Sequence, residues 1–220
     1  MNSTPRFHPP TPQRVTIAGP AGSLEAILEE PVLDEPSASS QRFAVVCHPH
    51  PQGGGTMDNK VVHTLARTLQ ELGLSTVRFN YRGVGRSEGT FADGIGETQD
   101  AVAVIDWGRR RWPEAELWLV GFSFGSHVAL RAGLERETAR MITVAPPVQG
   151  FDFASFVAPR CPWLVVQGDA DELVDCRQVV EWTRTLQPAP EVRILSGVGH
   201  FFHGRLHELK EVVRQAVLSG

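Results

Sequence analysis

A chain of 220 residues, of which 41% are hydrophobic and 21% charged, has enough apolar side chains for one or two folded domains, so a disordered protein is excluded. The formal net charge of −4 disfavours a nucleic-acid-binding protein, because phosphate recognition requires a basic surface. The longest apolar runs are far shorter than the roughly 18 residues that span a bilayer, so no membrane span is expected.

The beginning of the chain predicts an extended arm followed by two short strands. Residues 1–12 hold four prolines and no apolar signal-peptide core, so we expect an extended N-terminal arm. Residues 13–18 and 23–30 favour strands, with a Gly-Pro-Ala-Gly turn at residues 19–22 between them. Residues 31–41 are rich in proline, serine and alanine and are typical of a loop.

From residue 42 onward, short apolar runs alternate with helical segments. Strands are predicted at residues 43–47, 74–79, 117–120, 141–144, 163–166 and 192–195, and helices at residues 60–72, 96–111, 124–136, 176–187 and 204–218. This alternation predicts a doubly wound α/β fold with helices on both faces of a mostly parallel sheet. We expect one domain over residues 13–220, with ligands bound at the carboxyl ends of the strands.

The number and spacing of the cysteines indicate the redox environment in which the protein functions. Cys47, Cys161 and Cys176 are odd in number and widely spaced, so they form neither a disulfide framework nor a metal-binding pattern. Together with the missing signal peptide, this favours a cytoplasmic protein.

A glycine-serine-glycine motif follows the third of the alternating strands. Residues 121–125 read G-x-S-x-G, with Ser123 at the centre, and lie between a predicted strand and a predicted helix. A sharp turn from strand to helix strains the backbone of the serine. It brings strand and helix close together and leaves room only for small residues at the two glycine positions of the motif. The free N–H groups at the start of the helix then face the serine oxygen. This pattern is typical of a nucleophile elbow.

A nucleophilic serine needs a base and an acid, which in this architecture follow it in the order acid, then histidine. Residues 168–175 follow the strand at 163–166 and contain Asp169, Asp171 and Asp175. His200 follows the strand at 192–195. Both loops are expected at the same edge of the sheet as Ser123.

These motifs resemble the α/β-hydrolase superfamily over nearly the whole chain, from about residue 13 to the end. The resemblance depends on G-x-S-x-G at 121–125, G-x-x-D at 168–171, Gly-His-Phe at 199–201 and the segment at 80–89. It implies an eight-stranded α/β-hydrolase fold with Ser123, Asp171 and His200 as the catalytic triad. Asp169 is the alternative acid and Asp175 the next; Asp171 is favoured because it fills the motif position.

The loop after the strand at 43–47 is expected to complete an oxyanion hole. It reads His-Pro-His-Pro from His48, followed by a glycine run, and resembles a small lidless bacterial subgroup of serine hydrolases. Pro49 and Pro51 have no N–H, so the backbone N–H of His50 is the first available donor beyond the strand. The second donor that the resemblance implies is the backbone N–H of Phe124.

No metal and no cofactor are expected. His48, His50 and His63 lack a nearby cluster of cysteines or carboxylates at ligand spacing. The glycines at residues 83–89 nearly match the dinucleotide fingerprint, but the third is one place late and no helix follows at once, so a turn beside the site is the better interpretation.

The segment between the strands at 141–144 and 163–166 is too short for a cap domain. Residues 146–161 number 16, so we expect an open, lidless site. The resulting hypothesis is a serine hydrolase that cleaves a small-molecule ester or thioester through an acyl-enzyme. An acyltransferase, a cofactor-free haloperoxidase-like enzyme and a non-catalytic binding protein stay as alternatives. The natural substrate, the acyl-chain preference and the oligomeric state are left open by the sequence.

Overall fold

A computed structural model describes residues 11–31, 41–151, 153 and 157–218. Most of the predicted arm at 1–12 and of the loop at 31–41 lies outside these residues. The strands are β1 (Gln13–Gly19), β2 (Gly22–Glu29), β3 (Arg42–Cys47), β4 (Ser75–Phe79), β5 (Glu116–Phe122), β6 (Arg140–Val144), β7 (Trp163–Gly168) and β8 (Glu191–Leu195). The helices are the short 3-10 helix η1 (Pro51–Gly53) and α1 (Lys60–Glu71), α2 (Ile95–Arg111), α3 (Phe124–Glu135), α4 (Cys176–Thr185) and α5 (Leu206–Leu218).

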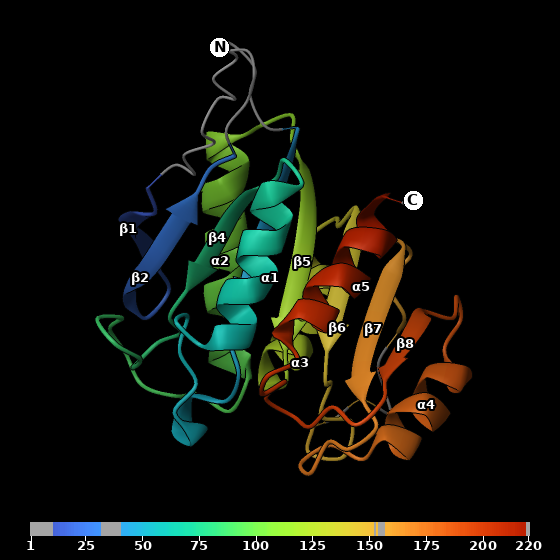
Figure 1. Cartoon of the computed structure of the whole chain (residues 1–220). Helices are drawn as coiled ribbons and strands as arrows, with labels where there is room; N and C mark the ends of the chain where they lie inside the picture. Colours follow the sequence, from blue (N-terminus) through green and yellow to red (C-terminus); the bar gives the residue numbers. More distant parts are fainter. Residues whose placement is uncertain (1–10, 32–40, 152, 154–156, 219–220) are drawn as a thin grey trace, which may run out of the picture.

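The eight strands form one mixed sheet in the order β1-β2-β4-β3-β5-β6-β7-β8. β1 pairs antiparallel with β2, and β2 antiparallel with β4, whereas the remaining pairs are parallel. The expected mostly parallel α/β-hydrolase sheet with helices on both faces is therefore confirmed (Figure 1).

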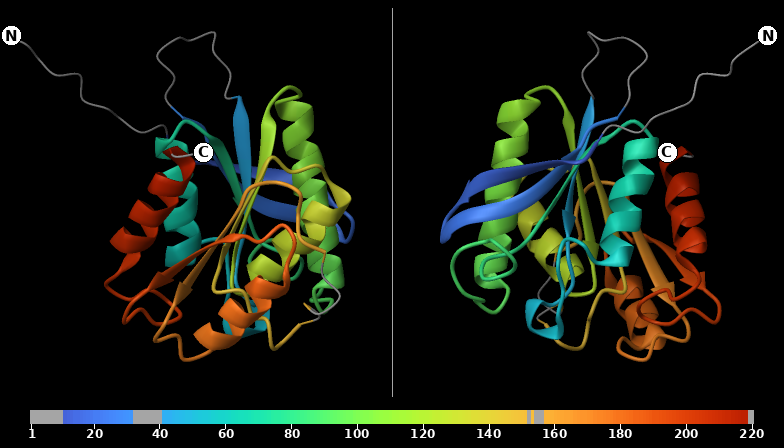
Figure 2. Two further views of the ribbon diagram at one scale, coloured as in Figure 1. Left: turned by 90° about the vertical axis from the view of Figure 1, so that its right-hand side faces the viewer. Right: turned by 60° about the vertical axis from the view of Figure 1, so that its left-hand side comes forward.

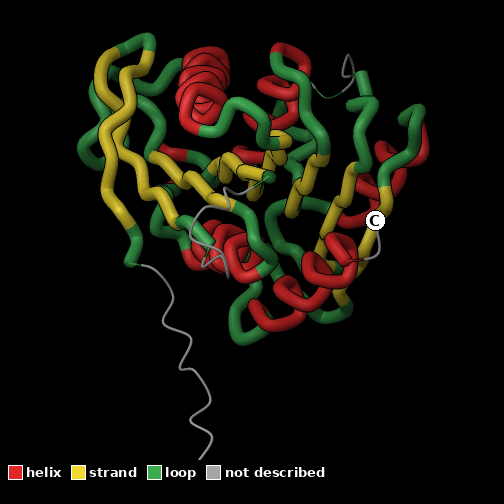
Figure 3. Tube along the Cα trace, turned by 90° about the horizontal axis from the view of Figure 1, so that it is seen from above, coloured by secondary structure: helices red, strands yellow, loops and turns green. Residues whose placement is uncertain are grey.

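Helices cover both faces of the sheet, as predicted for strands that are apolar along their length. α1 and α5 lie together on one face and α2 and α3 on the other (Figures 1 and 2). Seen from above, the sheet is a twisted band between the two helical layers (Figure 3). Two buried apolar clusters, one on each side of the sheet, form the core. Burial of this apolar surface is the main stabilising contribution to such a fold.

The sheet register brings loops that are far apart in sequence to one edge. Cys47, the last residue of β3, pairs with Gly121 near the end of β5, so the His-Pro-His-Pro loop begins beside the elbow. Gly168, the last residue of β7, pairs with Leu195 of β8, so the loop with Asp171 begins beside the loop with His200. The candidate site residues therefore meet at the carboxyl edge of the sheet.

The predicted elements agree with the observed ones to within a few residues. α5 begins at Leu206 rather than at 204, because Gly204 has a φ of 70° and belongs to a turn. In the segment between β6 and β7, the described residues contain no helix, in agreement with a lidless fold. Within the described part of the chain, every helix is too short or too polar to cross a membrane.

Candidate active site

The turn between β5 and α3 places Ser123 at the carboxyl edge of the sheet. Ser123 has φ 54° and ψ −123°, a strained conformation for a residue with a side chain. A Cβ atom on Gly121 would lie 2.1 Å from the carbonyl oxygen of Gly125, and one on Gly125 would lie 2.2 Å from that of Cys47. The two glycines of the motif are thus required by the close packing of strand, turn and helix.

The predicted triad residues form one hydrogen-bonded line. The Ser123 Oγ lies 3.1 Å from His200 Nε2, and His200 Nδ1 lies 2.8 Å from Asp171 Oδ2. The side chains of His200 and Asp171 are 3% and 1% exposed. The Phe122 ring packs beside the imidazole, with centroids 5.1 Å apart. This is the geometry in which an imidazole can take a proton from a hydroxyl while a carboxylate orients it.

Asp171 is held ionised by hydrogen bonds. Its Oδ1 accepts the backbone N–H groups of Leu173 and Val174 at 2.9 and 2.8 Å. Burial raises the pKa of Asp171, but the hydrogen bonds from His200, Val174 and Leu173 outweigh it, so the pKa lies below its usual value. A charged carboxylate therefore faces the imidazole at neutral pH.

The two alternative acids have other partners. Asp169 Oδ1 accepts the backbone N–H of Gly197 at 2.6 Å and joins the two loops. Asp175 caps the start of α4 by accepting the N–H of Arg177 at 2.8 Å. Neither carboxylate contacts the imidazole of His200.

The two expected oxyanion donors lie at this edge as well. Phe124 is the first residue of α3, and His50 precedes η1. Among the described residues, no acceptor is hydrogen-bonded to either backbone N–H. The rings of His50 and Phe124 are in contact, with centroids 4.9 Å apart. The His50 loop closes on itself, because Gly53 and Gly55 both donate to the carbonyl oxygen of His50 at 3.0 Å. An oxyanion hole requires free backbone donors of this kind.

The His50 ring has a defined tautomer. Its Nδ1 accepts the backbone N–H of Gln52 at 3.2 Å, so in the neutral ring the proton is on Nε2.

His48 supports the His-Pro-His-Pro loop from the protein interior. Its Nδ1 donates to the carbonyl oxygen of Pro49 at 2.7 Å, and its Nε2 accepts the N–H of Tyr81 at 3.2 Å. The Tyr81 hydroxyl donates to the carbonyl oxygen of His48 at 3.2 Å. Complete burial lowers the pKa of His48 to about 3. Both ring nitrogens are engaged, so His48 is a structural histidine.

The segment after β4 is a turn that braces this loop. Asn80 Oδ1 accepts the N–H of Met57 at 2.9 Å, and Ser87 Oγ donates to the carbonyl oxygen of Asn80 at 2.7 Å. Gly83, Gly85 and Gly89 all have positive φ, as the turn requires. The near match to a dinucleotide fingerprint is thus explained by backbone conformation.

Three contributing residues were not foreseen from the sequence. Glu172 Oε2 accepts the backbone N–H of His200 at 3.1 Å, Gln167 Nε2 lies 3.1 Å from Asp171 Oδ2, and Tyr81 bonds to the His-Pro-His-Pro loop at His48. One signal was available: Gln167 is a polar residue that directly continues the apolar run of β7.

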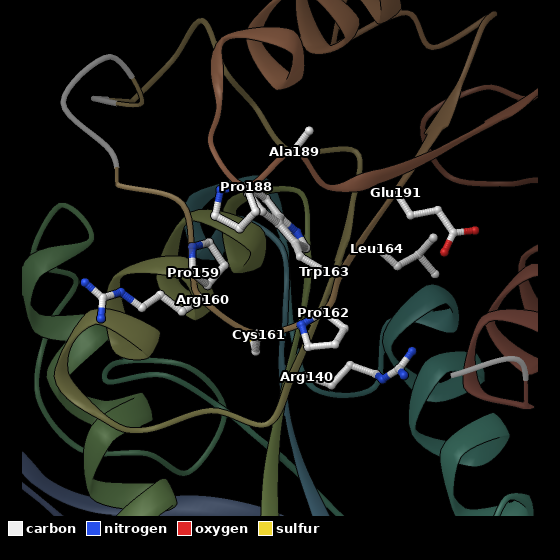
Figure 4. Close-up of a pocket in the computed structure, with 10 residues that line it drawn as sticks. All are labelled: Arg140, Pro159, Arg160, Cys161, Pro162, Trp163, Leu164, Pro188, Ala189 and Glu191. Atoms are coloured by element: carbon white, nitrogen blue, oxygen red, sulfur yellow. The ribbon is translucent and has the colours of Figure 1, made fainter.

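A separate hollow lies at the other end of the sheet. Figure 4 shows a cavity of about 380 Å³ lined by residues that include Arg140, Trp163 and Glu191, the first residues of β6, β7 and β8. Ser123 follows the carboxyl end of β5, so this cavity is separate from the candidate active site.

Comparisons with known proteins agree with this geometry. Residues 41–158 match the family model described as "Serine aminopeptidase, S33". An α/β serine hydrolase homologue from Coxiella burnetii has a TM-score of 0.87 and 44% identity over 92% of this chain and 96% of its own. A lidless α/β serine hydrolase from Xanthomonas campestris has a TM-score of 0.88 and 42% identity over 97% and 96%. An uncharacterised protein of Rickettsia prowazekii is 34% identical over 91% of this chain and 87% of its own.

Proposed function

The chain belongs to the α/β serine hydrolase family, and on this basis we propose that it hydrolyses carboxylic esters through an acyl-enzyme formed on Ser123. The observation that carries the proposal is the line from Ser123 Oγ to His200 Nε2 and from His200 Nδ1 to Asp171 Oδ2. The finer assignment to the His-Pro-His-Pro subgroup is part of the same proposal.

In this mechanism His200 accepts the proton of Ser123 as the hydroxyl oxygen attacks the ester carbonyl. The N–H groups of Phe124 and His50 stabilise the negative charge that develops on the carbonyl oxygen, and one such donor is typically worth about 10²–10³ in rate. His200 then protonates the leaving alcohol. Asp171 holds the imidazole in the required tautomer and stabilises its cation.

Deacylation repeats these steps with water. His200 takes a proton from a water molecule, the hydroxide attacks the acyl carbonyl, and the bond to Ser123 Oγ breaks as His200 returns the proton. A carboxylic acid is released. A thioester reacts in the same way, with a thiol as the leaving group. If an alcohol replaces water in the second step, the acyl group is transferred to that alcohol.

An ester is favoured over a peptide with a free amino terminus, the substrate that the family description suggests. A site for such a peptide needs a carboxylate that is available to the substrate ammonium group. In the described part of the chain, two acidic side chains contact His200: the Asp171 side chain is buried and hydrogen-bonded through both oxygens, so the exposed Glu172 is the one of the two that could make such a contact.

Partly exposed apolar rings instead gather next to one oxyanion donor. The rings of Phe91 and Phe151 lie 6.1 and 5.3 Å from that of Phe124, measured between centroids. An apolar wall of this kind suits an acyl group.

The test is Ser123→Ala, assayed with p-nitrophenyl esters of increasing acyl length and with a fluorophosphonate probe. We expect kcat to fall at least about 10⁴-fold and labelling to disappear, while the circular dichroism spectrum is unchanged. Ser196→Ala, in an exposed loop, is the control and should keep both activities.

Three outcomes distinguish the alternatives. Ester hydrolysis by Ser123→Ala at the wild-type rate would overturn the assignment of the nucleophile. A wild-type protein that is inert to the probe and to esters would be a binding protein on a hydrolase scaffold. Faster turnover of aminoacyl p-nitroanilides than of esters would make the protein an aminopeptidase.

A further inference from the structure

Gln167 is a buried amide at the carboxyl end of β7, and it is not part of the proposed triad. Its side chain is fully buried. Nε2 lies 3.1 Å from Asp171 Oδ2, 3.1 Å from the carbonyl oxygen of Gly168 and 3.2 Å from that of Val174. Three acceptors surround the nitrogen, so the amide orientation is set: the opposite rotamer would direct the amide oxygen toward three other oxygens.

The other end of the amide has no partner among the described residues. Gln167 Oε1 is buried and accepts no hydrogen bond from any of them. Such an acceptor lowers stability by the desolvation free energy that it does not recover. A methionine or leucine side chain would fill similar space without this penalty. Apolar packing alone therefore does not account for an amide at this position, whereas its donor end bonds to Asp171 Oδ2 and to two backbone carbonyl oxygens of the same loop.

We propose that Gln167 is a positioning residue that fixes the carboxylate of Asp171 for its interaction with His200. The inference rests on the proposed function. Leu173 and Val174 hold Oδ1 through their N–H groups, and Gln167 holds Oδ2. With both oxygens held from the protein side, the carboxylate cannot rotate, and Oδ2 stays 2.8 Å from the imidazole Nδ1.

The amide also takes a share of the negative charge on Oδ2. The ionisable groups that contact His200 are Asp171 at Nδ1, Ser123 at Nε2 and Glu172 at the backbone N–H, and Phe122 covers the ring. Asp171 Oδ2 is the oxygen that both the Gln167 amide and the His200 imidazole contact. Removing the amide concentrates charge on that oxygen and should stabilise protonated His200.

The variant Gln167→Met removes the donor and keeps the volume. We expect kcat per active site, counted with the fluorophosphonate probe, to fall about tenfold, the scale of one lost hydrogen bond to a charged acceptor. KM should stay within about twofold. The acidic limb of the kcat/KM profile should move up by about half a pH unit.

A second readout does not depend on catalysis. The pH midpoint for protonation of the His200 ring, followed by ¹⁵N NMR, should move up by the same amount in Gln167→Met. If Ser123 turned out not to be a nucleophile, the proposed function would fail, yet this midpoint would still test the link from Gln167 through Asp171 to His200.

The chain offers a matched control in Thr76. Its Oγ1 is also buried and has no partner in the described part of the chain, and Thr76 lies in β4, away from His200. Thr76→Val should leave kcat, KM and the NMR midpoint unchanged. Gln167→Leu is a second variant that lacks the donor, for use if methionine packs poorly at this position.

Two results would overturn the proposal. Unchanged kcat per labelled site together with an unchanged His200 midpoint would show that the amide does not act on Asp171. Failure of both Gln167 variants to fold, while Thr76→Val folds, would assign the amide to the stability of the sheet instead.

Discussion

Asp171 and Asp169 are two residues apart, yet their carboxylates have different neighbours. Asp171 Oδ2 lies against the imidazole of His200, whereas Asp169 Oδ1 bonds to the backbone of Gly197. Both partners lie in the loop after β8, three residues apart, so the conformation of the turn after β7 decides which carboxylate meets the imidazole.

Asp171→Asn should lower kcat about 10⁴-fold, because an amide at this position favours the wrong tautomer of His200. Asp169→Asn keeps an oxygen for the N–H of Gly197 and should change kcat less than about fivefold. Steady-state kinetics with p-nitrophenyl acetate measure both. A larger loss in Asp169→Asn than in Asp171→Asn would exchange the two roles.

His48 makes the stability of the protein depend on pH. The pKa of His48 is about 3 in the folded state, against an ordinary value of 6.5. Between these pH values the unfolded chain binds a proton that the folded chain does not, so unfolding is favoured as the pH falls below about 6.5. The free energy of unfolding should decrease by up to about 1.4 kcal/mol per pH unit from this group.

Urea denaturation between pH 7 and pH 4 measures this slope. His48→Gln should reduce it, because the buried imidazole is gone. His203→Gln, at an exposed position, should retain the wild-type slope. Equal slopes in wild type and His48→Gln would show that other groups dominate the acid sensitivity.

At the scale of elements, the geometry of the candidate site depends on two connections. The turn from β5 to α3 holds Ser123 in a strained conformation, and the loop after β3 passes close beneath α3. They are in close contact at Gly125, where a Cβ atom would lie 2.2 and 2.7 Å from the carbonyl oxygens of Cys47 and His48. Side chains larger than hydrogen have no space there.

Gly125→Ala should therefore destabilise the fold. Its Cβ would meet backbone atoms of β3, which cannot move without disturbing the sheet, so we expect a loss of about 3 kcal/mol or more. In Gly133→Ala, in the same helix, the one tight contact would be with the flexible end of Met141 at 2.9 Å, and stability should stay within about 1 kcal/mol of wild type. Urea denaturation compares the two, and equal losses would contradict the steric argument.

At the scale of the whole molecule, access to the site follows from what connects the strands. The described residues between β6 and β7 form no helix, and the Xanthomonas campestris structure with a TM-score of 0.88 is described as lacking a lid. The sheet places the loops that follow β3, β5, β7 and β8 at one edge (Figure 1).

A lidless hydrolase should show no interfacial activation. The rate of tributyrin hydrolysis should rise smoothly with concentration and show no jump when the substrate exceeds its solubility limit, because no cap has to move. Titration of free acid at constant pH follows the reaction. A several-fold jump at the solubility limit would indicate a segment that covers Ser123 in solution.

Much of the fold and of the candidate triad could be predicted because the signals are local. Several buried strands are continuous apolar runs, and each candidate residue lies in a loop or turn that follows a strand. The G-x-S-x-G spacing reflects sterics within five residues. The roles of Ser123, Asp171 and His200 stay a prediction until the variants are measured.

The features of the site that could not be predicted depend on contacts between residues that are far apart in sequence. The sequence by itself determined the alternation of strands and helices, the elbow and the loops that carry chemistry, since these follow from short-range sterics and from burial. The tertiary structure decided the strand order, the choice among three carboxylates and the positions of Tyr81 and Gln167. Tyr81 meets His48 across 33 residues, and Ser123 meets His200 across 77. Such contacts exist only once the sheet has brought the strand ends together.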